Sequence, residues 1–459
     1  MTKMQFQVQL NKKKIHLTAT QLVFYKQSKV LEATDKNSNY YYLIFYKNNF
    51  INGAKRNQIK INSHVHQAFK NGIRYLGEHP ITRTLIKKQK SFHLISFNQL
   101  YKSIQKKYTT LETALIFSYF DSFIKLESTH KLFRQTFYEY RRNGQHFAAY
   151  KLLNCYSLAY PNNKFAHDML HNLQFQTYKP IYQNMTTLYE KDPIYFEASF
   201  ESFKGNKGNQ TFLKLLFQLY REQNRLLDEL AVRSELLQLH DSEENNSTVI
   251  FLLENFSLDD QLLILQQLKQ HAAIREKSMQ LLLSTGKAND FVHFLFKTDF
   301  QPTPEQMDAI ITRFEQADSD VLSSHYQLSK TRLLTLCSFD ARILDKLVTP
   351  FVTAFFNHYS LHDILDWTEA FRKANFHLPI EQKLRKMQTM TEDPDQQFAL
   401  GELYVHFQQL EKSIDCFKWE MEMHPNNPKP VSYLSKIYNR LGQQEEATAY
   451  QQLFLQMNR

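Results

Sequence analysis

Two histidines spaced four residues apart form the pair most suggestive of chemistry in this chain. His167 and His171 fall in a segment expected to be helical, so both imidazoles share one face, which is the geometry that two zinc ligands need. Asp168 is the carboxylate between them, although a general base for a zinc-bound water is usually the longer glutamate. No third ligand stands out, and 18 histidines produce this spacing easily by chance. We therefore interpret the pair as helix surface, with a zinc hydrolase as the weaker alternative, and expect no metal site.

The sequence also lacks the glycine-rich motifs of nucleotide and acyl chemistry. It contains no GxxxxGK[ST] phosphate loop, no GxGxxG fingerprint and no GxSxG elbow, and only 9 of its 459 residues are glycine. These motifs use glycine where the backbone must approach a phosphate or turn sharply. We therefore predict a protein that is not an enzyme, with no catalytic residues and no cofactor.

Basic residues are concentrated near the N-terminus. Residues 1–110 contain 20 Lys or Arg and 3 Asp or Glu, a balance of +17, whereas the rest of the chain has a balance of −7. Such a division predicts an acidic partner for the N-terminal part, or its docking on the acidic part of the same chain. Both interpretations stay open. The candidate residues for an acidic partner are Lys12, Lys13, Lys14, Lys55, Arg56, Lys87, Lys88 and Lys90.

Aromatic residues are interleaved with these basic clusters. They include Phe24, Tyr25, residues 40–42, Phe45, Tyr46 and Phe50. Basic side chains neutralise phosphates, and exposed aromatic rings on a sheet can stack bases. However, no motif of a known nucleic-acid-binding fold is evident, and aromatic residues in short strands usually belong to the core. Binding of nucleic acid, the ribosome or another polyanion through residues 1–110 is therefore an alternative function.

The periodicity of apolar residues changes once along the chain. Met4, Phe6, Val8 and Leu10 alternate with polar residues, which predicts a half-buried strand, and the first sixty residues predict three to five strands. After Ile61 the period is helical, with capping boxes predicted at Ser96 and Thr109. We expect a mostly α protein, an α-solenoid of antiparallel helix pairs with a small β-rich N-terminal module. The predicted regions are a basic β-rich module (1–60), a basic helical connector (61–110) and two helical repeat arrays (111–240 and 248–459).

The end of the second array contains a repeat of 34 residues. In residues 394–427 the positions that define it are Pro394, Leu400, Gly401, Tyr404, Ser413, Phe417 and Pro425. In residues 428–459 they are Pro428, Leu434, Ser435, Tyr438, Gly442 and Ala447, and a third match begins at His130 and includes Phe133, Tyr140, Gly144, Ala149 and Pro161. This pattern resembles the tetratricopeptide repeat, a helix–turn–helix unit in which small residues let two helices cross closely.

The resemblance implies a curved solenoid that binds a protein or peptide in a concave groove lined by the first helix of each unit. The positions on this groove are Phe398, Glu402, Val405, Lys429, Lys436 and Asn439. A Lys–Asn pair there resembles the way some members of the family hold a carboxylate. We therefore expect a scaffold or adaptor that binds a protein or peptide and has a basic module for an acidic partner. A peptide-responsive regulator is the alternative that the resemblance also suggests.

Cysteine usage and hydropathy indicate the cellular compartment in which the protein is expected. Cys155, Cys337 and Cys416 are far apart and odd in number, which favours reduced thiols over a disulfide framework. The longest apolar run, YYYLIFY at residues 40–46, is far shorter than the roughly 18 residues of a membrane span. We expect a cytoplasmic protein without a membrane span.

Overall fold

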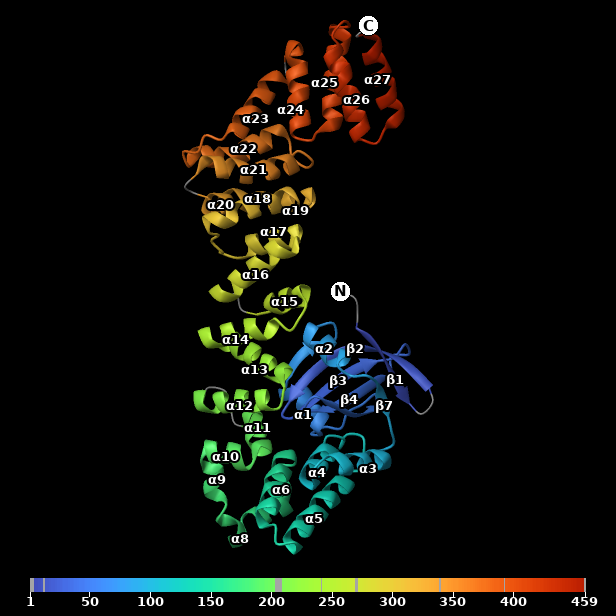
Figure 1. Ribbon diagram of the computed structural model, residues 1–459, viewed down its shortest axis with the longest axis vertical. Helices are drawn as coiled ribbons and strands as arrows, with labels where there is room; N and C mark the ends of the chain where they lie inside the picture. The colour runs from blue at the N-terminus through green and yellow to red at the C-terminus, as the bar shows by residue number, and fades with distance from the viewer. Residues whose placement is uncertain are drawn as a thin grey trace. The chain divides into compact units, whose positions relative to one another are not determined.

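The computed structural model describes residues 4–10, 13–202, 209–240, 242–268, 271–337, 340–391 and 393–457. The chain is mostly α-helical with a small β module at its N-terminus, as the sequence predicts (Figure 1). It divides into two compact units, Met1–His271 and Ala272–Arg459. The predicted break between two helical arrays at residues 241–247 falls inside the first unit, where helices α13 and α14 pack together.

The β module is one sheet that curls until its two edge strands meet. The strand order is β5-β4-β3-β2-β1-β7, and β6 pairs with β2. All neighbours are antiparallel except β1 and β7. Phe50 of β5 and Phe92 of β7 lie 5.0 Å apart between ring centroids, and the Asn52 side chain hydrogen bonds with both backbone groups of Ile95 at 2.9 and 3.1 Å. The strands are β1 (Gln5–Leu10), β2 (Lys13–Tyr25), β3 (Ser28–Thr34), β4 (Tyr40–Tyr46), β5 (Asn49–Lys55), β6 (Ile73–Leu76) and β7 (Phe92–Leu94).

Burial on both faces explains why β4 is a continuous apolar run. Tyr42, Ile44 and Tyr46 pack with helices α1 (His64–Asn71), α3 (Phe97–Lys107) and α4 (Thr110–Ser118). The next residues along the strand point to the other face, where Phe45 packs against Phe50 and Phe92. A strand covered on both sides has no polar face, so it shows no alternation.

The prediction that residues 61–110 form a helical connector is wrong in part. Helices α1, α2 (Pro80–Lys87) and α3 lie there, and the predicted capping boxes at Ser96 and Thr109 are both formed. However, β6 and β7 also lie in this range and complete the sheet. These strands have four and three residues, which is too short for a period to be read from the sequence.

Helices α4 to α15 form the helical part of the first unit. Consecutive helices pack as pairs, as α5 does with α6 and α12 with α13 (Figure 1). Their bounds after α4 are α5 (Leu126–Arg142), α6 (His146–Ala159), α7 (Lys164–Leu170), α8 (Leu173–Gln176), α9 (Lys179–Gln183), α10 (Met185–Lys191), α11 (Pro193–Ser202), α12 (Gln210–Glu222), α13 (Leu226–Leu239), α14 (Glu243–Leu253) and α15 (Leu258–Leu265).

The second unit is helical throughout the part that the structure describes. Aromatic residues such as Phe351, Phe355 and Trp367 fill the space between its helices. The helices are α16 (Ala272–Thr285), α17 (Ala288–Lys297), α18 (Met307–Glu315), α19 (Ser319–Ser324), α20 (Tyr326–Leu336), α21 (Ala341–Phe355), α22 (Leu361–Lys373), α23 (Pro379–Met390), α24 (Gln397–His406), α25 (Leu410–Met423), α26 (Pro428–Arg440) and α27 (Gln444–Met457), with 3₁₀ turns at Pro304–Gln306 and Pro394–Gln396.

The last four helices form the two pairs that the repeat predicts. Ser413 and Phe417 of α25 are fully buried, and the Phe417 ring covers Gly401 of α24. A Cβ atom at Gly401 would lie 2.9 Å from two atoms of that ring. The glycine therefore permits the close crossing of α24 and α25.

We expect the substitution Gly401→Ala to destabilise the second unit. In an open helix the change from glycine to alanine stabilises by roughly 1 kcal/mol, but here the added methyl group overpacks the crossing, which costs about 1–3 kcal/mol. Urea denaturation of the full chain measures the difference. Asp415→Ala on the exposed face of α25 is the control, with an expected change within roughly 0.5 kcal/mol. A stabilised Gly401→Ala variant would contradict the close crossing.

Candidate binding surfaces

The basic residues predicted for an acidic partner separate into two places on the sheet. Lys55 is the last residue of β5 and pairs with Tyr41 of β4. It therefore lies at the end of the sheet where a turn joins β3 to β4. Lys13 pairs with Leu10 and lies beyond Thr34 in the same direction, because Thr18 pairs with Thr34. We call this the distal end of the sheet. The exposed cations that the structure brings there are Lys13, Lys14, Lys55 and Arg56.

Lys36 is a further exposed cation at the distal end. It lies in the turn between β3 and β4, which the sequence marks as a polar break, but a single lysine in a turn gives no signal of its own. Lys12 lies outside the described residues.

Lys87, Lys88 and Lys90 lie elsewhere on the module. They surround Gln89, whose side chain donates to the backbone oxygen of Asn48 at 3.0 Å. Asn48 lies in the turn between β4 and β5, at the opposite end of the sheet from Lys55. The three lysines are exposed, but they do not join the distal cations in one patch.

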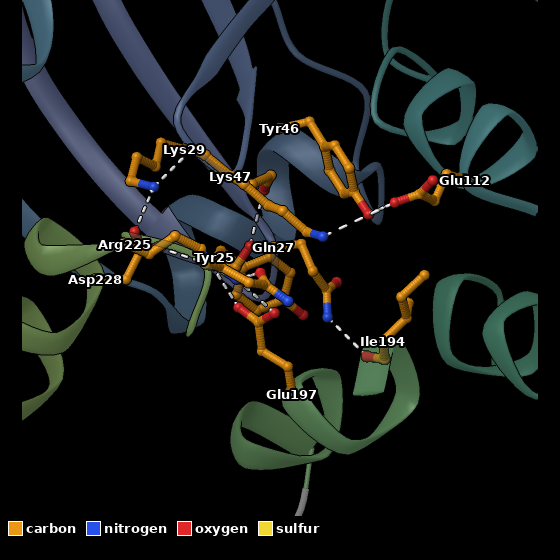
Figure 2. Close-up of polar contacts among 12 residues, drawn as sticks. Tyr25, Gln27, Lys29, Tyr46, Lys47, Glu112, Ile194, Glu197, Arg225 and Asp228 are labelled. Carbon is orange, nitrogen blue, oxygen red and sulfur yellow. Dashed lines mark hydrogen bonds and ion pairs between the residues drawn. The ribbon is translucent and has the colours of Figure 1, made fainter. Parts of the chain in front are cut away.

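The opposite end of the sheet docks on the helices of the same unit, and we call it the docked end. The Gln27 side chain, in the turn between β2 and β3, donates to the backbone oxygen of Ile194 at 2.7 Å (Figure 2). Asn48, in the next turn, donates to the oxygen of Asn224 at 3.0 Å. Tyr46 donates its hydroxyl proton to Glu112 of α4 at 2.9 Å. Both of these turns therefore bond to the helical part of the unit, one to α11 and one to the turn between α12 and α13.

A buried ionic network forms the centre of the docked end. The Lys29 ammonium is fully buried and lies 2.7 Å from the Asp228 carboxylate of α13. Arg225 binds Glu197 through two hydrogen bonds of 2.6 and 2.8 Å and binds Asp228 at 2.8 Å. Lys29 also donates to the backbone oxygen of Lys47 at 2.6 Å (Figure 2). Two cations and two carboxylates thus balance one another away from water.

The pKa values of this network follow from its geometry. Burial lowers the pKa of Lys29 to about 8, although the Asp228 carboxylate opposes the change. Burial alone would raise the pKa of Asp228, but Arg225 and Lys29 hold it below its ordinary value. The network shows that part of the N-terminal positive charge is neutralised within the chain, which was one of the two interpretations left open.

Most aromatic residues of the strands lie in the core and offer no platform for bases. Phe24, Tyr25, Tyr42, Phe45 and Tyr46 are buried. Tyr41 is also buried, whereas Tyr40 is exposed. Stacking of bases requires exposed rings in a row on one face, so the structure does not support the aromatic part of the nucleic-acid alternative.

The predicted groove residues of α24 and α26 fall into different environments. Phe398 and Val405 are partly buried and pack into the apolar cluster around Phe417. Glu402 accepts a hydrogen bond of 2.8 Å from the hydroxyl of Tyr433, which links the two helices. Lys429 is exposed. Sequence reasoning missed Tyr433, since only the distance between neighbouring units reveals its role.

Lys436 and Asn439 line a cavity of about 510 Å³ between α26 and α27. Ser432 and Ser435 add hydroxyl groups, and Ala447 and Phe454 add apolar surface. The amide oxygen of Asn439 accepts from Gln444 at 3.1 Å, so the orientation of the amide is fixed. The Ser435 hydroxyl donates to the backbone oxygen of Ala447 at 3.0 Å. The Lys436 ammonium, the Ser432 hydroxyl and the Asn439 amide are groups of the cavity that can donate hydrogen bonds to a carboxylate.

The histidine pair lies on α7 and at its C-terminal end. The Nε2 atom of His167 hydrogen bonds with the backbone oxygen of Pro161, and the Nδ1 atom of His171 with that of His167 at 2.7 Å. Across the described ranges, no three His, Cys, Asp or Glu side chains are grouped so that they could hold a metal ion.

Ser28, His64 and Asp121 are of the residue types of a hydrolase triad but lack its geometry. The Ser28 hydroxyl and the Nε2 atom of His64 are 2.7 Å apart. Asp121, however, accepts from the backbone N–H of His64 at 3.0 Å and does not orient the ring. Ser28 is also buried at the docked end. The nucleophile is thus neither accessible nor activated in the manner of a triad.

Comparison with known proteins adds little to this geometry. No protein-family model and no curated protein matches the chain. Among solved structures, the chain is similar to one in "Structure of Naa15/Naa10 bound to HypK-THB", with 11% identity and a TM-score of 0.18 over 77% of this chain and 64% of that chain. The chain thus spans less than two thirds of that protein, and a TM-score this low supports no argument about function.

Two further findings concern the cysteines and the membrane. Cys155, Cys337 and Cys416 are buried and form no disulfide. No helix in the part of the chain that the structure describes is long and apolar enough to cross a membrane.

We expect the substitution Asp228→Asn to destabilise the first unit by about 3–5 kcal/mol, because it leaves the buried Lys29 and Arg225 with one carboxylate for two cations. Urea denaturation at pH 7 measures this cost. Glu139→Gln on the exposed face of α5 is the control, with an expected change within roughly 0.5 kcal/mol.

The difference in stability between wild type and Asp228→Asn should depend on pH. Folding lowers the pKa of Asp228 from its ordinary value of 3.8, so the stability that it supplies is present above that pH and is lost as the pH falls through the lower, folded value. The gap between wild type and Asp228→Asn should therefore narrow below about pH 4. Equal stability of the two proteins at pH 7 would contradict the network.

Proposed function

We propose that the protein is a non-enzymatic scaffold of the tetratricopeptide type that binds an acidic peptide segment of a protein partner. The observation that carries the proposal is the cavity between α26 and α27, where Lys436, Asn439 and two serines meet apolar side chains. A solenoid of helix pairs provides a long surface for a chain of this kind. A carboxylate of the partner accepts hydrogen bonds from Lys436 and the Ser432 hydroxyl, and an apolar neighbour packs on Phe454.

The distal end of the sheet has a second role in this proposal. Lys13, Lys14, Lys36, Lys55 and Arg56 are exposed there, while the docked end is occupied by helices of the same unit. An acidic surface of the partner is attracted to these cations, which raises the rate of association more than the affinity. The buried aromatic residues favour an acidic protein over a nucleic acid for this surface.

The cavity is tested with a fluorescein-labelled peptide that ends in Glu-Asp with a free C-terminus, measured by anisotropy against the full chain. We expect Lys436→Glu to weaken binding by about tenfold or more, since a hydrogen bond to a charged group is worth about 1.5–3 kcal/mol. Amidation of the peptide C-terminus should weaken binding in the same direction.

Lys346→Glu, which reverses an exposed lysine on α21, is the matched control and should bind as wild type does. If the peptide binds equally to wild type and Lys436→Glu, the cavity does not hold a carboxylate.

The distal end is tested by reversing Lys13, Lys14, Lys55 and Arg56 to glutamate in one variant. We expect its binding to poly-glutamate to be lost at physiological salt. Screening there limits attraction to charges within about 8 Å, so the reversed residues are the ones that a polyanion at the distal end meets. Binding as a function of salt is measured by anisotropy, with single-stranded DNA as a second probe.

The control variant reverses four exposed lysines on the helices of the same unit, Lys131, Lys164, Lys179 and Lys191. Net charge changes equally in the two variants. Equal losses would show that net charge, and not the distal end, attracts polyanions, and tighter binding of DNA than of poly-glutamate would favour the nucleic-acid function.

A further inference from the structure

A cavity of about 630 Å³ lies in the first unit. Its walls come from five places: the turn after β2, helix α1, the segment after α4, the C-terminal end of α6, and helix α7. Cavities that bind small molecules have volumes of roughly 300–1,000 Å³. The lining side chains include Tyr25, His64, Asp121, Tyr160 and His167.

Asp121 is a buried carboxylate in the wall of the cavity. It is 5% exposed and accepts hydrogen bonds from the backbone N–H of His64 at 3.0 Å and from the hydroxyl of Tyr160 at 3.4 Å. The Lys60 ammonium donates to the backbone oxygens of Asp121 and Ile124 rather than to the carboxylate, although its charge still lowers the pKa of Asp121. Burial raises the pKa of Asp121 to about 6, so it is mostly ionised at pH 7.

The other walls also favour a cation. The backbone at Ser157, Leu158 and Ala159 ends α6, where the last carbonyl groups of the helix carry the negative end of its dipole. Lys26 already donates to the oxygen of Leu158 at 3.3 Å, which shows that this end holds an ammonium group. The Tyr25 ring already faces an ammonium group, since the Lys26 Nζ atom lies 5.1 Å from its centroid, and Tyr160 adds a second ring of the kind that attracts cations.

The imidazole nearest to the carboxylate adds no opposing charge. Burial lowers the pKa of His64 to about 3, so the ring is neutral at physiological pH. It hydrogen bonds with Ser28 and stacks on Tyr119 at 4.1 Å between ring centroids. The amide side chains of Asn62, Gln67 and Asn71 provide neutral hydrogen-bonding groups on the α1 side of the cavity.

We propose that this cavity is a binding site for an alkylammonium group, with the Asp121 carboxylate as its counter-ion and the tyrosine rings as its walls. The group belongs either to a free small amine or to the lysine side chain of a peptide. The site lies in the first unit and does not depend on the cavity between α26 and α27.

The test is isothermal titration of the full chain with n-pentylamine, with 1-pentanol as the neutral probe of the same length. We expect the amine to bind and the alcohol to bind at least tenfold more weakly. Asp121→Asn should weaken binding of the amine at least tenfold. Asp192→Asn, which removes another buried carboxylate whose partner is the Tyr182 hydroxyl, should leave binding unchanged.

The pH dependence distinguishes a direct role of Asp121 from a structural one. Because the carboxylate is protonated near pH 6, affinity for the amine should fall about tenfold between pH 7 and pH 5. Tyr160→Phe removes a donor that lowers the pKa of Asp121, so it should move the midpoint to higher pH. The remaining titratable and charged groups around the carboxylate are His64, Lys26, Lys60 and His167, and His167→Gln should leave the midpoint unchanged.

Three results would overturn the proposal: equal binding of pentylamine and pentanol, full affinity in a folded Asp121→Asn variant, or no binding of the amine. A second titration with the peptide N-acetyl-Gly-Lys-Gly-amide separates the two sources of the group. Tighter binding of this peptide than of pentylamine assigns the cavity to a lysine side chain, and weaker binding assigns it to a free amine.

Discussion

The first unit depends on one set of buried charges. Lys29 of β3 meets Asp228 of α13, and Arg225 connects that carboxylate to Glu197 of α11. A pair of charges away from water is costly when one partner is missing, and it tolerates few geometries when all are present. The network therefore favours the orientation of the sheet on the helices in which Lys29 meets Asp228, since Arg225 and its two carboxylates all belong to the helical part.

Neutral contacts around the network follow the same orientation. The side chains of Gln27 and Asn48 donate to the backbone oxygens of Ile194 and Asn224. The first bond satisfies the buried amide of Gln27, which would otherwise have no partner. A helical repeat buries its apolar face only against a neighbour, and in this unit the curled sheet is such a neighbour for α1, α3 and α4. The β module is thus part of the core of the unit. Its distal end faces solvent and carries the exposed basic side chains.

The sequence predicts those features that repeat along the chain. Alternation marks β1, and a 34-residue period marks the helix pairs from α24 to α27, where Ser413 and Phe417 lie buried at the crossing as the repeat requires. Strands β6 and β7 are too short to carry a period. They belong to the sheet because β1 and β2 present open edges to them, and that is a property of the tertiary structure.

The functional side chains are less predictable, because their environment depends on residues far away in the sequence. Nothing in the local sequence distinguishes buried Lys29 from exposed Lys13, or ranks Asp121, in a turn after α4, above the other acidic residues. The groove positions of α26 were predicted from the repeat, but the cavity at Lys436 needs α27 to complete it. Tyr433 gains its partner Glu402 from the preceding unit.

The separation of Lys29 from Asp228 also affects how the chain emerges from the ribosome. The two residues are 199 positions apart, and synthesis at roughly 5–20 residues per second leaves an interval of about 10–40 s between them. During that interval the sheet can form its strands, but its lysine has no carboxylate to meet. The nascent module must keep that ammonium in water, so the docked end closes only after α13 has been made.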